Sequence, residues 1–344
     1  MFYRWRRMEE EDRGRVWRLY GWFAALMACG SCVGAVTWAA MMMQLTNGFE
    51  GIASEDMAQL TSYVALNYSW YAAFTVTYAI EFLCLCAAKL MVLDRMSVFA
   101  APQGTRLQTR WAAAGRIVMA AVVLGNAVGL AANAAAAVHF QKAAQDMSTA
   151  SAYYAANNTK DGFSFFLLSQ QEVQRGGSIA SVQAFSEVAV LLLIVDAFVA
   201  AGVMSARNLT SSLLIFDQAT QRVSEDGRLQ LTAAAATGRS LRLRFVATTA
   251  FVFVAFVLRA VYSTMYAVSL QLKDTITESC PSFCDECRNE YAHMLNWMTY
   301  TPEFQVLIVL VSSPVALLVA LWGMTSNATL YLMKTSKQQA LFSL

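Results

Sequence analysis

The sequence predicts an all-α polytopic membrane protein of about six transmembrane helices, with both the N- and the C-terminus on the cytoplasmic side. Three observations support this fold class. Hydrophobic residues make up 57% of the 344 residues and charged residues only 14%, whereas soluble chains carry about 25% charge. Six stretches reach the length of about 20 apolar residues that a spanning helix needs. Basic residues gather on one side of these stretches.

The predicted spans and the segments between them divide the chain as follows. The spans cover residues 19–43, 63–93, 112–140, 179–204, 245–270 and 304–330, and Pro314 interrupts the last one. We expect a basic segment 1–18, a helical bundle over 19–334 and a tail 335–344. The segments expected outside are 44–62, 141–178 and 271–303, and those expected inside are 94–111 and 205–244.

The orientation follows from the lysines and arginines. Eighteen of them fall in the segments placed inside or, for Arg116 and Lys334, at the inner ends of spans, whereas the five placed outside are Lys142, Lys160, Arg175, Lys273 and Arg288. Cytoplasmic loops of membrane proteins carry this excess of positive charge, so the distribution sets the threading of the chain. The opposite orientation would reverse the bias.

Two of the connecting segments contain patterns of their own. In 141–178 we expect breaks at Asn157-Asn158, Asp161-Gly162 and Gly176-Gly177. The apolar piece 163–168 is too short to span and is interpreted as re-entrant or interfacial. In 205–244 we expect two helical extensions with a turn near residues 225–227.

Charges inside the spans carry the most functional information, because ionisable groups in lipid are costly and usually face a partner or a water-filled path. At about 1.5 Å per residue, three of them lie roughly 16 to 22 Å from the inner boundary, namely Glu81, Asp196 and Arg259. Glu187 lies nearer the outer face. Lys89 is close enough to the inner end of its span for its amine to reach the headgroups.

Two interpretations of this charged cluster stay open. In the functional one, Arg259 with Glu81 or Asp196 lines a path that binds or conducts a polar solute or ion. In the structural one, an ion pair fixes which helices touch, although buried pairs are weak evidence for stability. Because Glu81 and Asp196 share one arginine, one carboxylate of the cluster is left without an ion-pair partner, which favours the functional interpretation.

Small and amide residues indicate where helices pack. Gly30 with Gly34, and Gly125 with Gly129, are both GxxxG pairs, and such residues let helix backbones approach closely in a membrane. Asn126 and Asn133 are seven residues apart and share the face of the second pair. Packing is the ordinary interpretation, and a polar lining is the alternative.

The outer segment 271–303 contains Cys280, Cys284 and Cys287, in a compartment that permits disulfides. One internal disulfide with one thiol left for a partner chain is the favoured interpretation. A zinc site that adds His293 as fourth ligand is the less favoured one. Cys29, Cys32, Cys84 and Cys86 fall in apolar runs and are expected to be small core residues.

No catalytic residue, metal or cofactor is expected. The chain has two histidines and lacks an HExxH motif, a Walker loop and a GxGxxG loop, so we expect no enzyme. The arginines on the inner side are expected to contact anionic lipid and not nucleic acid.

The first functional interpretation is a channel or transporter for a small ion or solute. The alternative is a non-catalytic subunit of a larger membrane assembly, a homo- or hetero-oligomer. A receptor has less support and an intramembrane enzyme the least. The location expected is the plasma membrane or another membrane of the secretory pathway.

Glycosylation tests the predicted orientation. Asn157 begins an Asn-x-Thr sequon on the outer side, whereas the sequons at Asn208 and Asn327 lie inside, so of these three we expect N-linked sugar on Asn157. The measurement is the mass lost on treatment with an N-glycosidase, followed by peptide mass spectrometry to locate the modified asparagine. Sugar on Asn208 or Asn327 would show that the chain is threaded the other way.

Overall fold

The computed structural model describes residues 10–100, 106–220 and 246–269, together with the single positions 243, 293 and 315. Side-chain environments are described over 21–94, 109–207 and 246–269, and at those single positions. Within this part of the chain five helices are long and apolar enough to cross a membrane, and no strand occurs. The protein is therefore a helical, multi-pass membrane protein. The predicted sixth span, 304–330, lies outside the described residues except for Val315.

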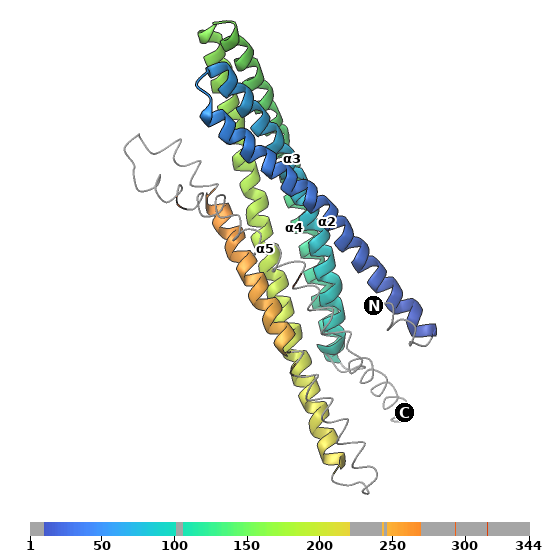
Figure 1. Cartoon of the computed structure of the whole chain (residues 1–344). Helices are drawn as coiled ribbons and strands as arrows, with labels where there is room; N and C mark the ends of the chain where they lie inside the picture. The colour runs from blue at the N-terminus through green and yellow to red at the C-terminus, as the bar shows by residue number, and fades with distance from the viewer. Residues whose placement is uncertain are drawn as a thin grey trace. The chain divides into compact units, whose positions relative to one another are not determined.

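Figure 1 shows the described helices in chain order. They are α2 (Glu10–Ala53), α3 (Met57–Ala100), α4 (Arg106–Ala155) and α5 (Thr159–Thr220), followed by the unlabelled orange helix Val246–Ser269. None of these helices contains a proline, because the four prolines of the chain are Pro102, Pro281, Pro302 and Pro314. The end of α3 at Ala100 fits Pro102, since a proline disfavours helical backbone in the residue before it.

The turn between α2 and α3 spans only residues 54–56. Asp56 caps the start of α3, because its Oδ1 accepts a hydrogen bond of 3.1 Å from the backbone N–H of Ala58. At the C-terminal end of α2, the N–H of Ser54 donates to the carbonyl of Gly51 over 3.2 Å. The acidic segment expected between the first two spans is thus almost entirely helical.

The turn between α4 and α5 is equally tight. Asn157 has a φ of 59°, a left-handed conformation that asparagine tolerates better than most residues and that commonly ends a helix. Asn158 then caps α5, since its Oδ1 accepts from the N–H of Asp161 and its Nδ2 donates to the Asp161 carboxylate at 2.8 Å. The exposed Asn157 lies at this turn.

Two expectations for this region are wrong. The chain breaks at Asn157-Asn158 but not at Gly162 or at Gly176-Gly177, and residues 163–168 belong to the continuous helix α5 instead of a re-entrant piece. The physical reason is close packing. A Cβ on Gly176 would lie 2.9 Å from the Phe140 ring, and one on Gly162 would lie 3.1 Å from the Tyr154 ring. These glycines make room for aromatic rings on α4 and do not end a helix.

The helices are longer than a membrane is thick. At about 1.5 Å per residue the 62 residues of α5 extend over roughly 93 Å, whereas the hydrocarbon core measures about 30 Å. Both α4 and α5 therefore continue beyond the bilayer. The first of the two helical extensions expected after residue 205 is confirmed, because α5 runs on to Thr220.

The chain divides into two compact units. The first unit comprises residues 1–87, 123–190 and 261–305. Its core is made of small residues against one aromatic ring, a cluster of Ala72, Ala136, Ala137, Phe140, Ala143, Val173 and Ala180. Small side chains let α3, α4 and α5 approach closely, as helices do where lipid supplies no hydrophobic drive.

The second unit comprises residues 88–122, 191–260 and 306–344. Among its described residues, Phe198 and Phe256 are buried and meet edge to face, with ring centroids 5.5 Å apart. Gly202 on α5 lies against the Thr249 side chain, which a Cβ at that position would overlap. The described core of this unit therefore combines two aromatic rings with aliphatic side chains such as Leu191 and Ile194.

The contact of Gly176 with the Phe140 ring can be tested through the stability of the protein. Gly176→Ala should lower the free energy of unfolding by about 1–3 kcal/mol, because the added methyl meets the Phe140 ring, which is itself 2% exposed and has little room to move. The measurement is thermal unfolding of the purified protein in one detergent.

Gly115→Ala is the matched control, because a Cβ at Gly115 meets nothing within 4 Å. Its alanine should be neutral or stabilising by up to about 1 kcal/mol through helix propensity. Equal unfolding temperatures for Gly176→Ala and the unmodified protein would contradict the packing argument.

Candidate functional site

A buried carboxylate, Glu187, is the centre of a polar group among the described residues of the first unit. Its side chain is 3% exposed and lies on α5. The Tyr78 hydroxyl from α3 donates to it, 2.8 Å from Oε2 and 3.0 Å from Oε1. The Ser263 hydroxyl from helix Val246–Ser269 donates to Oε1 over 2.8 Å, and Gln183 Nε2 donates to Oε2 over 3.1 Å. Three helices therefore converge on one carboxylate, which we name the Glu187 site.

The helical repeat explains why these side chains meet. Gln183 precedes Glu187 by four residues, so both lie on the same face of α5. A carboxylate removed from water is strongly disfavoured unless hydrogen-bond donors replace the water. Hydroxyl and amide donors satisfy its lone pairs here, and hydrogen bonds to an ionised acceptor are stronger than those between neutral groups. The site can therefore hold negative charge in an apolar surrounding.

A second polar contact joins two of the same helices, about two turns from the Glu187 site along α3. Tyr71 precedes Tyr78 by seven residues on α3, and Tyr266 follows Ser263 by three residues, so each pair shares a helix face. The hydroxyls of Tyr71 and Tyr266 are 3.1 Å apart and hydrogen-bonded. In the predicted orientation this contact is nearer the outer face than Glu187 is.

One aromatic ring joins the two levels. The Phe74 ring stacks on Tyr71 at a centroid distance of 6.0 Å and on Tyr78 at 5.7 Å. Residues Tyr71, Phe74 and Tyr78 therefore form a continuous aromatic face on α3, with hydroxyls at both of its ends. The two hydroxyl levels are about 10 Å apart along the helix.

Glu81, the other acid that the sequence places inside a span of the first unit, faces α2. A Cβ added to Gly34 would lie 3.0 Å from the Glu81 carboxyl carbon and 3.0 Å from its Oε1. Gly30, one turn earlier, faces Cys84 in the same way at 3.3 Å. The first GxxxG pair thus lies at the contact of α2 with α3, and Gly34 makes room for a polar group.

The second GxxxG pair faces α5. A Cβ on Gly125 would approach Val190 to 2.5 Å, and one on Gly129 would lie 3.5 Å from Gln183. The carbonyl of Gly125 also accepts a hydrogen bond of 2.7 Å from Ser186. The nearby Asn133, 2% exposed, donates to the carbonyl of Thr75 over 2.9 Å, and Asn126 is 6% exposed.

The second unit contains the remaining two residues of the predicted cluster. Arg259 is 4% exposed, whereas Asp196 is exposed on the surface of α5. The structure records no hydrogen bond or ion pair that joins Asp196 to another described residue. Of the four predicted charges, Glu187 is the one that the structure surrounds with hydrogen-bond donors. Asp196 is exposed whereas Arg259 is buried, so these two side chains lie in different environments.

The expectation that Lys89 reaches the headgroups is wrong. Its side chain is fully buried in the second unit, and its Nζ lies 4.7 Å from the centroid of the Phe256 ring. The ring face attracts the ammonium, and such contacts gain strength when water is excluded. The position of Lys89 along its span predicted an amine at the membrane–water interface, but the amine lies over the Phe256 ring instead.

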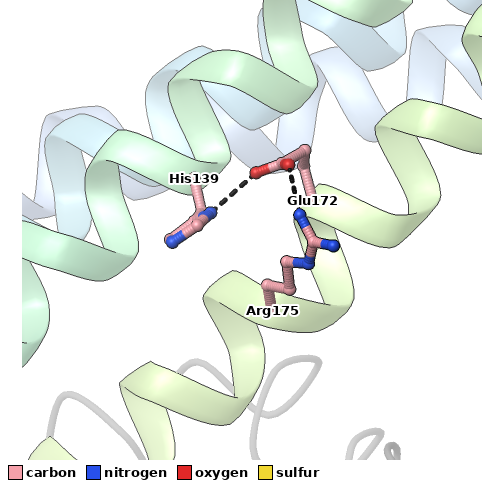
Figure 2. A network of polar contacts seen from close by, with 3 residues as sticks. All are labelled: His139, Glu172 and Arg175. Atoms are coloured by element: carbon pink, nitrogen blue, oxygen red, sulfur yellow. Dashed lines mark hydrogen bonds and ion pairs between the residues drawn. The ribbon is translucent and has the colours of Figure 1, made fainter.

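A smaller polar network joins the outer parts of α4 and α5. His139 Nδ1 lies 2.6 Å from Glu172 Oε2, and Arg175 Nη1 lies 3.0 Å from Glu172 Oε1 (Figure 2). Arg175 is 63% exposed, so its pairing adds little to stability. This network ties two antiparallel helices together, and its carboxylate is accessible to water.

The cysteine and metal expectations are only partly covered by the described residues. Cys280, Cys284 and Cys287 lie outside them, whereas the described His293 is exposed. Cys84 and Cys86 are buried as expected, whereas Cys29 and Cys32 are exposed on α2, so the expectation of core residues is wrong for these two. None of the four is in a disulfide among the described residues, and the sulfur atoms of Cys29 and Cys84 are 3.9 Å apart. Within the described residues no group of three or more histidine, cysteine or acidic side chains could hold a metal ion.

The sequence did not single out Tyr78, Gln183 and Ser263, the three donors to Glu187. A signal for one of them was present, because Gln183 lies one helical turn before an intramembrane acid. Tyr78 and Ser263 come from other helices, and spacing along the chain does not reveal such contacts.

The chain matches no model of a known protein family, no curated protein and no solved structure. No activity is therefore transferred to it by similarity. Among the described residues, the Glu187 site brings together the largest number of polar side chains from different helices.

Proposed function

We propose that this multi-pass membrane protein is a transport protein for a small cation, and not an enzyme, with Glu187 as the binding carboxylate. The observation that carries the proposal is a buried acid on which three helices converge, with hydrogen bonds from Tyr78, Gln183 and Ser263. Acids inside membrane bundles typically mark ion pathways or proton relays. The hydroxyl and carboxylate oxygens of this site are ligands suited to a proton or a hard cation.

The depth of the site fits such a role. Glu187 lies eight residues inside the outer end of its predicted span, about 12 Å below the outer surface. A cation that enters from outside would meet the Tyr71–Tyr266 contact first and the Glu187 carboxylate next. Glu81 lies about one turn further in than Tyr78 on the same helix. We propose that it is the next acidic group on the path.

Replacement of the binding carboxylate tests the proposal. Glu187→Gln should lower cation flux at least tenfold, because an amide keeps the shape of the side chain but neither binds a proton at neutral pH nor balances a cation. The measurement is uptake of protons, sodium or potassium by vesicles reconstituted with the purified protein.

Glu172→Gln is the matched control, since it makes the same chemical change on the same helix in the outer network and should leave flux unchanged. Elution profiles and unfolding temperatures establish that both variants are folded. Full flux through a folded Glu187→Gln protein would refute the role of this carboxylate, and no flux of any of the three cations through the unmodified protein would refute transport of them.

A second prediction concerns the tyrosine contact. Tyr71→Phe removes the hydroxyl that bonds Tyr266 and should speed access from outside to Glu187 about threefold to tenfold, because one net hydrogen bond is worth about 1 kcal/mol. The readout is the rate at which an apolar carbodiimide labels Glu187, followed by peptide mass spectrometry.

The control is Tyr68→Phe, because the Tyr68 hydroxyl accepts from the exposed Gln170 and lies away from the Glu187 site. Tyr68→Phe should label at the rate of the unmodified protein. Equal rates for Tyr71→Phe and Tyr68→Phe would show that the tyrosine contact does not limit access.

The alternative function, a non-catalytic subunit of a membrane assembly, is favoured by one specific observation. Asp196 is exposed on a helix within the predicted membrane span, and an isolated acid facing lipid is disfavoured. Both functions are compatible in one protein, because Glu187 and Asp196 are separate positions. The secretory pathway remains our proposal for its location.

A further inference from the structure

One face of α5 is exposed through the predicted span. Within the second unit the exposed positions on this face are Leu192, Asp196, Ala200 and Val203, with Leu192 48% and Val203 45% exposed. Their spacing of four, four and three residues places them in a single row along the helix. The opposite face is buried through residues such as Phe198. Asp196 is therefore the acidic member of an otherwise apolar row, which we name the Asp196 face.

The depth of Asp196 makes the exposure costly. Eleven residues separate it from Arg207 at the inner boundary, which corresponds to roughly 16 Å, close to the middle of a hydrocarbon core of about 30 Å. A carboxylic acid there cannot snorkel to either interface, because its side chain is short. Polar groups at this depth are typically paired with another group.

The cations of this chain do not offer that pairing from a second copy. Three basic residues fall within the predicted spans. Lys89 and Arg259 are 0% and 4% exposed, whereas Arg116 is exposed but lies only four residues from the inner end of its span. All other lysines and arginines fall outside the predicted spans. Two copies that met through the Asp196 face would bring acid against acid.

We propose that the Asp196 face binds a transmembrane helix of another protein that carries a lysine or arginine at the same depth. An ammonium or guanidinium group would neutralise the carboxylate where water is absent, and opposite charge selects this partner against one that is merely apolar. Leu192 and Val203 would pack on the partner above and below the charge pair. The small Ala200 lets the two backbones approach closely.

A synthetic helix tests this proposal with the full chain in lipid vesicles. The probe is a fluorescent polyleucine helix of about 20 residues with one lysine at its centre, and the comparison peptide has leucine at that position. The unmodified protein should bind the lysine helix about fivefold to thirtyfold more tightly, the range that one polar contact between membrane helices provides. Energy transfer from a label on the protein measures the binding.

Asp196→Leu should abolish the preference for the lysine helix, and it should fold because it completes an apolar row that faces lipid. Glu172→Gln, which removes an acid in the outer network, should keep the preference. Equal binding of the two peptides by the unmodified protein, or a preference that survives Asp196→Leu, would overturn the proposal. An oligomer of this chain that Asp196→Leu dissociates would also overturn it, because a second copy would then be the occupant.

Cation flux separates this inference from the transport proposal. Asp196→Leu should lose peptide preference while flux through the Glu187 site is kept, and Glu187→Gln should show the reverse. Loss of both properties in either variant would contradict the independence of the two sites.

Discussion

The absence of water from the bilayer core is the constraint on which the structure depends. Every backbone group in lipid has to be hydrogen-bonded within the protein, and a helix meets this requirement by itself. Side-chain hydroxyls follow the same rule, because Thr37 and Thr75 each donate to the carbonyl four residues earlier, at 3.0 and 2.7 Å. Polar groups without such a local acceptor have to find one on another helix. The contacts between helices in the first unit are the consequence.

Glycines and alanines allow these hydrogen bonds between helices, because their small side chains let the helices approach closely. Backbone carbonyls are exposed to a neighbouring helix only where the side chains are small, and Gly125 shows both effects, since it accepts a hydrogen bond from Ser186 and lies against Val190. Gly34 leaves space for the Glu81 carboxylate instead. Small residues therefore do more than allow dense packing. They open the spaces in which a bundle without water can hold polar groups.

Much of the fold could be predicted from the sequence because it rests on sums over many residues. Apolar length and the absence of internal proline predict long helices, and the five described ones agree. Features that depend on one contact could not be predicted. Gly176-Gly177 has the composition of a break, yet the ring of Phe140 requires a small residue there. The Lys89 amine was expected at the membrane–water interface, yet it is buried in the protein over the Phe256 ring. In both cases the deciding residue belongs to another helix.

The two acids of α5 show what the sequence could have established about the site. Glu187 and Asp196 are nine residues apart, which at 3.6 residues per turn is about two and a half turns and places them on opposite sides of the helix. They cannot both point into one bundle. The structure buries Glu187 among hydroxyls and leaves Asp196 exposed, so a single helix holds one acid in the interior and one on its surface. Matched depth alone grouped Asp196 with Glu81 and Arg259, whereas helical phase separates an acid that faces the interior from one that faces outward.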